Sequence, residues 1–157
     1  MQNTSSHRMD TILKAANASI PVAAAGAVFA NMACDTGCTY LYGAMFGIDL
    51  NYLGIMLAAA LLLLSLPVPH PAYLHITGHA RACLLWFSMG IGPVLLHFQI
   101  AHEVFCPFCL VYGALVLAMF AVNWHMTKLY AGLALFAAGF ALSFFFFEGS
   151  AIPVFTF

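Results

Sequence analysis

The sequence predicts an all-α polytopic membrane protein: one domain, residues 1–157, with five transmembrane helices. The chain has only four basic and five acidic residues, 64% of it is apolar, and its mean hydropathy is +1.00. A soluble domain carries roughly 25% charged residues and could not hide so much apolar surface from water. With a net charge of −1, the chain also has nothing to neutralise a phosphate backbone, so nucleic-acid binding is excluded.

The helices are predicted from apolar length, since a spanning helix needs about 20 mainly apolar residues. The first stretch is the weakest because it contains Asn17, Pro21 and Asn31, and the second ends at the proline cluster of residues 67–71, which cannot continue a helix. The last two stretches are joined by residues 125–128 alone, so they form a tight antiparallel hairpin. The five predicted spans cover about residues 15–33, 50–66, 82–101, 106–124 and 129–147.

Two shorter segments lie between the first three spans. Residues 40–46 are apolar but too short to span, and they are predicted to form a half-helix in the membrane interface. In the loop before the third span, His75 and His79 would share one face of a helix, but Gly78 and the proline cluster argue against a helix there. We therefore expect no metal site at these histidines.

Orientation follows from the basic residues. With five spans, all four basic residues fall on the side of the membrane that holds the N-terminus: Arg8, Lys14, Arg81 and Lys128. This distribution predicts a cytoplasmic N-terminus and an external C-terminus. The first stretch could also be a cleaved signal peptide, but it is long enough to span, so a retained anchor is preferred.

Four of the five cysteines converge at the outer face in this topology. Cys34 and Cys38 flank Asp-Thr-Gly just after the first span, and Cys106 and Cys109 open the fourth span as Cys-Pro-Phe-Cys. Cysteine pairs on the oxidising side of a membrane indicate disulfide chemistry. The lone Cys83 is interpreted as a small buried hydrophobic residue.

The Cys-Pro-Phe-Cys segment suits thiol exchange. Pro107 fits the first helical position, so Cys109 lies in the first turn, where unpaired amides favour a thiolate. Cys34 and Cys38 are expected in a flexible stretch, which gives a partner protein and the Cys106/Cys109 pair access to their sulfurs. The two pairs could form a relay that passes electrons to a lipid-soluble quinone. Static structural disulfides and a zinc site with four cysteine ligands remain alternatives.

Three segments together resemble the vitamin K epoxide reductase family, in its bacterial disulfide-forming branch without a fused thioredoxin-like domain. They are the Cys34/Cys38 pair, Gly-Ile-Asp-Leu-Asn-Tyr-Leu-Gly at residues 47–54, and Cys-Pro-Phe-Cys-Leu-Val-Tyr at residues 106–112. The order of the pairs also matches this family, whereas in DsbB-type quinone oxidoreductases the Cys-x-x-Cys comes first.

The resemblance implies a four-helix bundle around ubiquinone or menaquinone in a bacterial inner membrane, with the cysteines on the periplasmic side. It implies that Cys109 acts on the quinone and that Cys106 exchanges with Cys38. Cys34 would then engage a separate periplasmic thioredoxin-fold, DsbA-like protein.

The chain departs from the family's pattern in three places. The spacing between Cys34 and Cys38 is short for the family. The usual serine after the second loop cysteine is absent, and Gly43 and Ala44 lie in that region. Asp49 replaces a common proline.

Polar residues inside a membrane are candidates for function because their burial is costly. A quinone carbonyl that gains charge needs hydrogen-bond donors and a proton source. His102 is the first candidate because it is nearest in sequence to Cys106, followed by Asn51, which begins the second span, Tyr112 on the fourth, and His97 on the third.

The leading interpretation is a membrane thiol-disulfide oxidoreductase that oxidises a soluble thioredoxin-like partner and reduces a quinone. The alternatives are reduction of a quinone epoxide and a non-enzymatic membrane subunit with structural disulfides or zinc.

Overall fold

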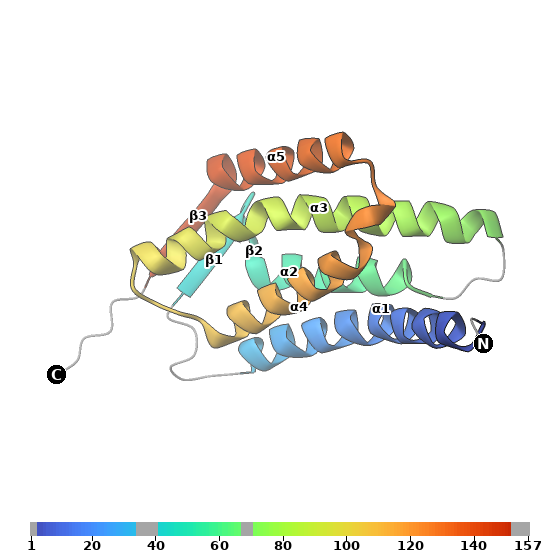
Figure 1. Ribbon diagram of the computed structural model, residues 1–157. Coiled ribbons are helices and arrows are strands. Elements are labelled where there is room, and N and C mark those ends of the chain that lie inside the picture. The colour runs from blue at the N-terminus through green and yellow to red at the C-terminus, as the bar shows by residue number, and fades with distance from the viewer. Residues whose placement is uncertain (1–2, 34–40, 67–70, 152–157) are drawn as a thin grey trace.

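The computed structural model describes residues 3–33, 41–66 and 71–151 (Figure 1). Helices form at all five predicted places, and three short strands accompany them. The elements are α1 (Asn3–Met32), β1 (Leu41–Met45), β2 (Ile48–Asp49), α2 (Leu50–Leu63), α3 (Pro71–Ala101), α4 (Pro107–Asn123), a 3₁₀ turn η1 (Trp124–Met126), α5 (Leu129–Phe146) and β3 (Phe147–Ala151).

Four of the described helices carry a segment long and apolar enough to cross a membrane: Leu13–Met32, His75–Ala101, Pro107–Met126 and Leu129–Phe146. The predicted second span is the 14-residue α2, which is about 21 Å long and shorter than a hydrocarbon core of about 30 Å. Large apolar side chains cover the outside, for example Tyr130 at 83% exposed and Phe145 at 75%. Lipid accounts for such a surface and water does not.

Helices α1 to α4 pack together, and α5 lies against α3 on the side away from α1 (Figure 1). The core between α2, α3 and α4 contains Leu61, Leu85, Val116 and Met119, all nearly inaccessible. This arrangement makes α5 an addition to one flank of the bundle.

Glycine permits the close contact between α3 and α5. A Cβ at Gly90 would collide with the backbone oxygen of Phe136, and one at Gly139 with the backbone oxygen of Phe87. Small residues let two helix backbones approach, which is a common basis of helix association in membranes. The two glycines therefore fix where α5 can lie.

A small antiparallel sheet, in the order β2-β1-β3, joins the segment after α1 to the segment after α5. Phe46 and Gly47 turn the chain between β1 and β2, both with positive φ (56° and 75°), as tight hairpins require. The interfacial half-helix predicted for residues 40–46 is thus wrong where the structure describes it, and the all-α class holds only for the bundle. Residues 41–45 form a strand because they pair with β3, which lies about 100 residues later in the sequence.

Helix α3 begins at Pro71, earlier than the predicted residue 82, and includes His75, Gly78 and His79. Proline is tolerated at a first helical position, where its missing N–H would have no partner. The expectation that this proline cluster prevents a helix at the histidines is therefore wrong. The two imidazoles lie one turn apart, with ring centroids 4.3 Å from each other.

At the end of the bundle where α4 stops, a polar cluster joins four segments. Asn123, 2% exposed, donates to the side-chain oxygen of Asn17 at 2.8 Å and accepts from the Nε of Arg81 at 3.1 Å. Arg81 also reaches the hydroxyl of Ser65 at 3.5 Å. This cluster ties α1, α3 and α4 to the end of α2.

Candidate functional site

Cys106 is the N-cap of α4. Its backbone is extended (φ −85°, ψ 112°), and its sulfur accepts the backbone N–H of Cys109 at 3.3 Å. Its carbonyl accepts the N–H of Leu110 at 3.1 Å, and Pro107 follows as the first helical residue. The thiol thus takes the place of the serine or threonine oxygen that commonly caps a helix.

The capping geometry changes which thiol the helix N-terminus favours. In the sequence, the first-turn amides favour a thiolate at Cys109 and apolar burial opposes it, whereas in the structure the N–H of Cys109 points at the sulfur of Cys106. Hydrogen bonds from the Cys109 thiol and from the N–H groups of Cys109 and Phe108 lower the pKa of Cys106 below its usual range, against the opposing effect of burial. Cys106, which just precedes the apolar span, is thus the more acidic of the two thiols in this geometry.

Cys106 is also held by side chains from two other helices. It is 5% exposed, and its N–H donates to the Oε1 of the buried Gln99 on α3 at 3.1 Å. Its sulfur lies 3.9 Å from the Oδ1 of Asn31, in the last turn of α1, and can donate its proton there. The residue is therefore fixed at both its backbone and its thiol.

Asn51 joins this cluster through Asn31. The Nδ2 of Asn31 donates to the Oδ1 of Asn51 at 2.8 Å. Asp49, the N-cap of α2, accepts the backbone N–H of Asn51 at 2.7 Å, which fixes the backbone and leaves the side chain as the variable part. Of the predicted quinone ligands, Asn51 is the one that the structure links to Cys106.

Tyr112 lies one turn beyond Cys109 and bonds to α2. Its hydroxyl donates to the backbone oxygen of Gly54 at 3.0 Å. Its described role is thus to bind α4 to α2, although its oxygen can still accept a hydrogen bond.

The two histidines predicted to be near the quinone lie apart from this cluster. His97 and His102 are both exposed, and the His102 ring packs against Phe98 at 4.4 Å. Within the described residues, neither side chain is hydrogen-bonded to Cys106, Cys109 or Asn51. Residues 102–105 connect α3 to Cys106, so proximity in sequence does not bring His102 into this cluster, and its role at a quinone stays a prediction.

Two residues of the cluster were not predicted as site residues, Asn31 and Gln99. Both are 7% exposed and polar within an apolar helix, so the rule that points to buried intramembrane polar groups applies to them as well. The signal was present in the sequence, but their neighbours could not be known from it.

Cys109 differs from Cys106 in exposure. It lies on the same face of α4 as Tyr112, Val116 and Met119, the face that packs into the core farther along the helix. Nevertheless, its side chain is exposed. A ligand can therefore reach Cys109 at the end of the bundle while Cys106 stays covered.

An apolar groove of about 250 Å³ lies between α1 and α2. On α2 it is lined by Ile55, Ala58, Ala59 and Leu62, which continue the helix face of Asn51 at helical spacing. A polar headgroup near Asn51 could thus have an apolar chain directed along this surface.

The remaining cysteines give less information. Cys34 and Cys38 lie outside the described residues, and Cys83 is free and half-buried on α3. Among the described residues, no three His, Cys, Asp or Glu side chains converge as metal ligands. A zinc site that used Cys34 and Cys38 falls outside that statement.

Comparison of the chain with protein-family models, with curated proteins and with solved structures found no significant match. Its function therefore has to be argued from its own residues.

Proposed function

We propose that this protein is a membrane thiol-disulfide oxidoreductase. It oxidises a separate thioredoxin-fold protein through the Cys34/Cys38 pair, passes the electrons to Cys106 and Cys109, and reduces a quinone. The observation that carries the proposal is the contact between Cys106 and Asn31, because it brings the end of α1 to the start of α4.

Because Asn31 contacts Cys106, chain length limits how far the loop cysteines can lie from the Cys106/Cys109 pair. Cys34 follows Asn31 by three residues, and three residues of chain span at most about 11 Å. A disulfide needs Cα atoms within about 7 Å of each other. Covalent geometry therefore keeps Cys34 within about 11 Å of Asn31, and Cys38, seven residues away, within about 25 Å. This reach allows exchange with Cys106, although about seventy residues of sequence separate the pairs.

The residues fit a quinone as electron acceptor. Cys109 is accessible at the end of the bundle, Asn51 offers an amide, and the groove beside α2 offers an apolar surface. Each turnover removes two electrons and two protons from the partner's dithiol, which becomes a disulfide, and a quinone takes up both to become a hydroquinone. A lowered pKa at Cys106 favours this transfer, because Cys106 leaves as the thiolate when Cys34 resolves the Cys38–Cys106 mixed disulfide, and a more acidic thiol leaves faster.

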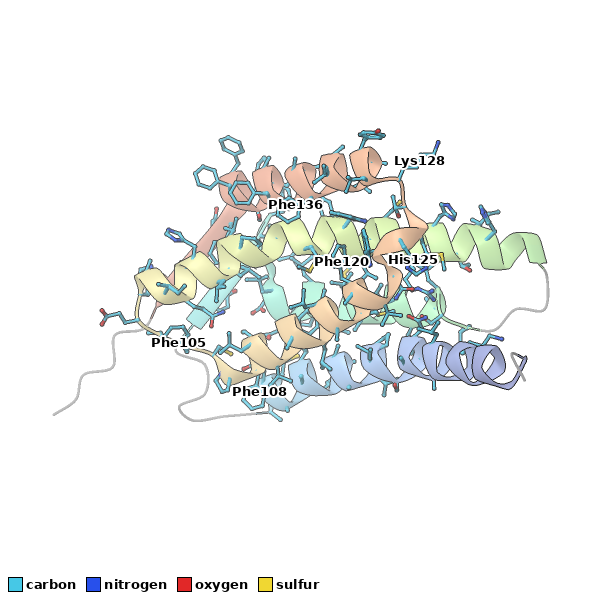
Figure 2. The ribbon with its side chains drawn as sticks, in the orientation of Figure 1. Phe105, Phe108, Phe120, His125, Lys128 and Phe136 are labelled. Carbon is cyan, nitrogen blue, oxygen red and sulfur yellow. The ribbon has the colours of Figure 1, made fainter. Side chains whose placement is uncertain are left out.

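Basic residues support the proposed orientation. Lys128 lies at the end of α4 opposite to Phe105 and Phe108 (Figure 2), and Arg81 bonds to Asn123 at that same end. By the positive-inside rule, this supports a cytoplasmic position for this end and a periplasmic position for Cys106 and Cys109 in a bacterial inner membrane.

The test is a turnover assay with the purified full chain in detergent. A reduced DsbA-like protein is mixed with ubiquinone-1 or menadione, and both the quinone absorbance and the partner's thiols are followed. We expect one quinone to be reduced for each disulfide formed. Loss of thiols without loss of quinone would overturn the proposal.

The same preparation separates the alternatives. A quinone-epoxide reductase would consume a vitamin K-type epoxide with a dithiol, and a zinc protein would contain metal by elemental analysis. A structural disulfide protein would show thiols that do not change in number when quinone is added.

A further inference from the structure

The amide of Asn31 lies between Cys106 and Asn51 and bonds to both. Its oxygen lies 3.9 Å from the sulfur of Cys106, and its NH₂ group donates to the oxygen of Asn51 at 2.8 Å. An asparagine side chain has one acceptor end and one donor end. In this arrangement the oxygen of Asn51 is used by Asn31, so the NH₂ group of Asn51 is the end left for another group.

This arrangement fits a Cys106 that carries its proton. A thiol can donate to the oxygen of Asn31, whereas a thiolate or a disulfide sulfur can only accept. When Cys106 loses its proton, the Asn31 amide is better satisfied after a half-turn, with its NH₂ group toward the sulfur. Its oxygen then faces Asn51, whose amide has to turn as well and leaves its carbonyl as the free end.

The side chains that face Cys106 allow this exchange. They come from Cys109 on α4, Asn31 on α1 and Gln99 on α3, and among these described groups only Cys109 titrates. Hydrogen bonds to its sulfur lower the pKa of Cys106, which brings its thiol and thiolate forms closer in free energy near neutral pH.

We propose that Asn31 is a positioning residue that couples the state of Cys106 to the orientation of the Asn51 amide. This inference rests on the proposed function and adds a basis for ligand preference. A quinone presents carbonyl acceptors, and a hydroquinone presents hydroxyl donors. With Cys106 as a thiol, Asn51 offers a donor to the quinone; after the electrons have left the cysteines, it offers an acceptor to the hydroquinone. One hydrogen bond to the ring is thus kept through the two-electron transfer.

The test uses two variants that cannot transfer electrons, so that binding is measured at equilibrium. Cys106→Ser with Cys109→Ala keeps a hydroxyl donor toward Asn31, and Cys106→Ala with Cys109→Ala has none. Dissociation constants are measured for ubiquinone-1 and, without oxygen, for ubiquinol-1. We expect the serine form to favour the quinone over the quinol by about fivefold more than the alanine form does, the effect of one hydrogen bond.

Asn31→Leu is then introduced into both forms. If Asn31 is the link, the difference between the serine and alanine forms disappears. Asn17→Leu is the matched control, because Asn17 is also on α1 and bonds to an asparagine amide at 2.8 Å, but lies about 20 Å away along the helix. In that control the difference remains.

Each other outcome has a definite meaning. A difference that persists in Asn31→Leu, or equal preference in all forms that bind, overturns the role of Asn31 and leaves the proposed function standing. Failure of every form to bind either ring overturns both. Should Asn31→Leu fail to give a folded helical protein by circular dichroism and size-exclusion chromatography, Asn31→Ala replaces it in the same comparison.

Discussion

Asn31 and Asn123 lie toward opposite ends of the bundle, and each bonds to another asparagine across helices at 2.8 Å. Asn123 uses its remaining groups on Arg81 and on the backbone oxygen of Met119, partners that keep one state near neutral pH. Asn31 has Cys106 as its remaining partner, which can lose a proton or form a disulfide. The same residue type in an apolar setting is therefore a fixed brace at one end and a responsive contact at the other.

The largest effect is expected at the responsive end. Cys106→Ala and Cys109→Ala should each reduce quinone-coupled turnover to background, because both thiols are needed to accept and release two electrons. The assay is quinone reduction with a reduced DsbA-like protein, and folding is checked by circular dichroism. Turnover within about threefold of wild type in either variant would show that the pair does not carry the reaction.

A second experiment tests whether the responsive end communicates with the loop pair. A mixed disulfide persists when its resolving thiol is removed, so replacing Cys34 and Cys109 by alanine should trap a bond between Cys38 and Cys106. A non-reduced digest analysed by mass spectrometry should contain the joined peptides, and reductant should release them.

The matched control for the trap is the Cys38/Cys109 double variant. If it alone yields a linked product, Cys34 is the loop cysteine that meets Cys106. If neither variant yields one, the two pairs do not exchange, and the structural-disulfide or zinc alternatives become the better account.

Asn123→Ala should have the opposite profile to the cysteine variants. It removes the bonds to Asn17 and Arg81 and leaves a half-buried cation without its nearest acceptor, which we expect to lower the free energy of unfolding by about 2–4 kcal/mol. Thermal unfolding in detergent measures this loss. Turnover per folded molecule should change by less than about twofold, and a large loss of turnover with unchanged stability would contradict the role as a brace.

The smallest effect is expected where α5 meets α3, away from both polar clusters. Gly139→Ala places a methyl group against the backbone oxygen of Phe87, and overpacking of this kind costs about 1–3 kcal/mol. Gly92→Ala is the control, because a Cβ there meets nothing within 4 Å. Equal stability of the two variants would show that α5 is not held by this contact.

Apolar length predicted where the five helices lie, because a membrane imposes that pattern on each helix separately. Four of the described helices are long enough to span, whereas α2, predicted as the second span, is shorter. Two errors came from local rules that tertiary context overrides. Pro71 was interpreted as a helix breaker but begins α3. Residues 40–46 were interpreted as a half-helix, yet β1 forms there because it pairs with β3, from Leu41 opposite Ala151 to Met45 opposite Phe147. No local pattern can reveal a partner that is so distant in sequence.

The site was predicted in part. The sequence singled out Cys106 and Cys109 because their thiols lie at the start of a helix, and Asn51 because it is a polar residue that heads a predicted span. It did not single out Asn31, because a polar residue in an apolar helix has many possible neighbours, and its contact with Cys106 spans 75 residues. It favoured His102, whose ring packs on Phe98 and whose role at a quinone stays a prediction.

The pairing of β1 with β3 has a consequence for biosynthesis. Strand β1 leaves the ribosome about 100 residues before β3, a delay of about 5–20 s at ordinary rates of translation. During that interval the main ladder of β1 cannot yet form, and all five cysteines are synthesised before α5 and β3 arrive. Completion of the ladder is thus a late event, and premature termination before residue 147 would yield a chain with all five of its cysteines but no closing strand.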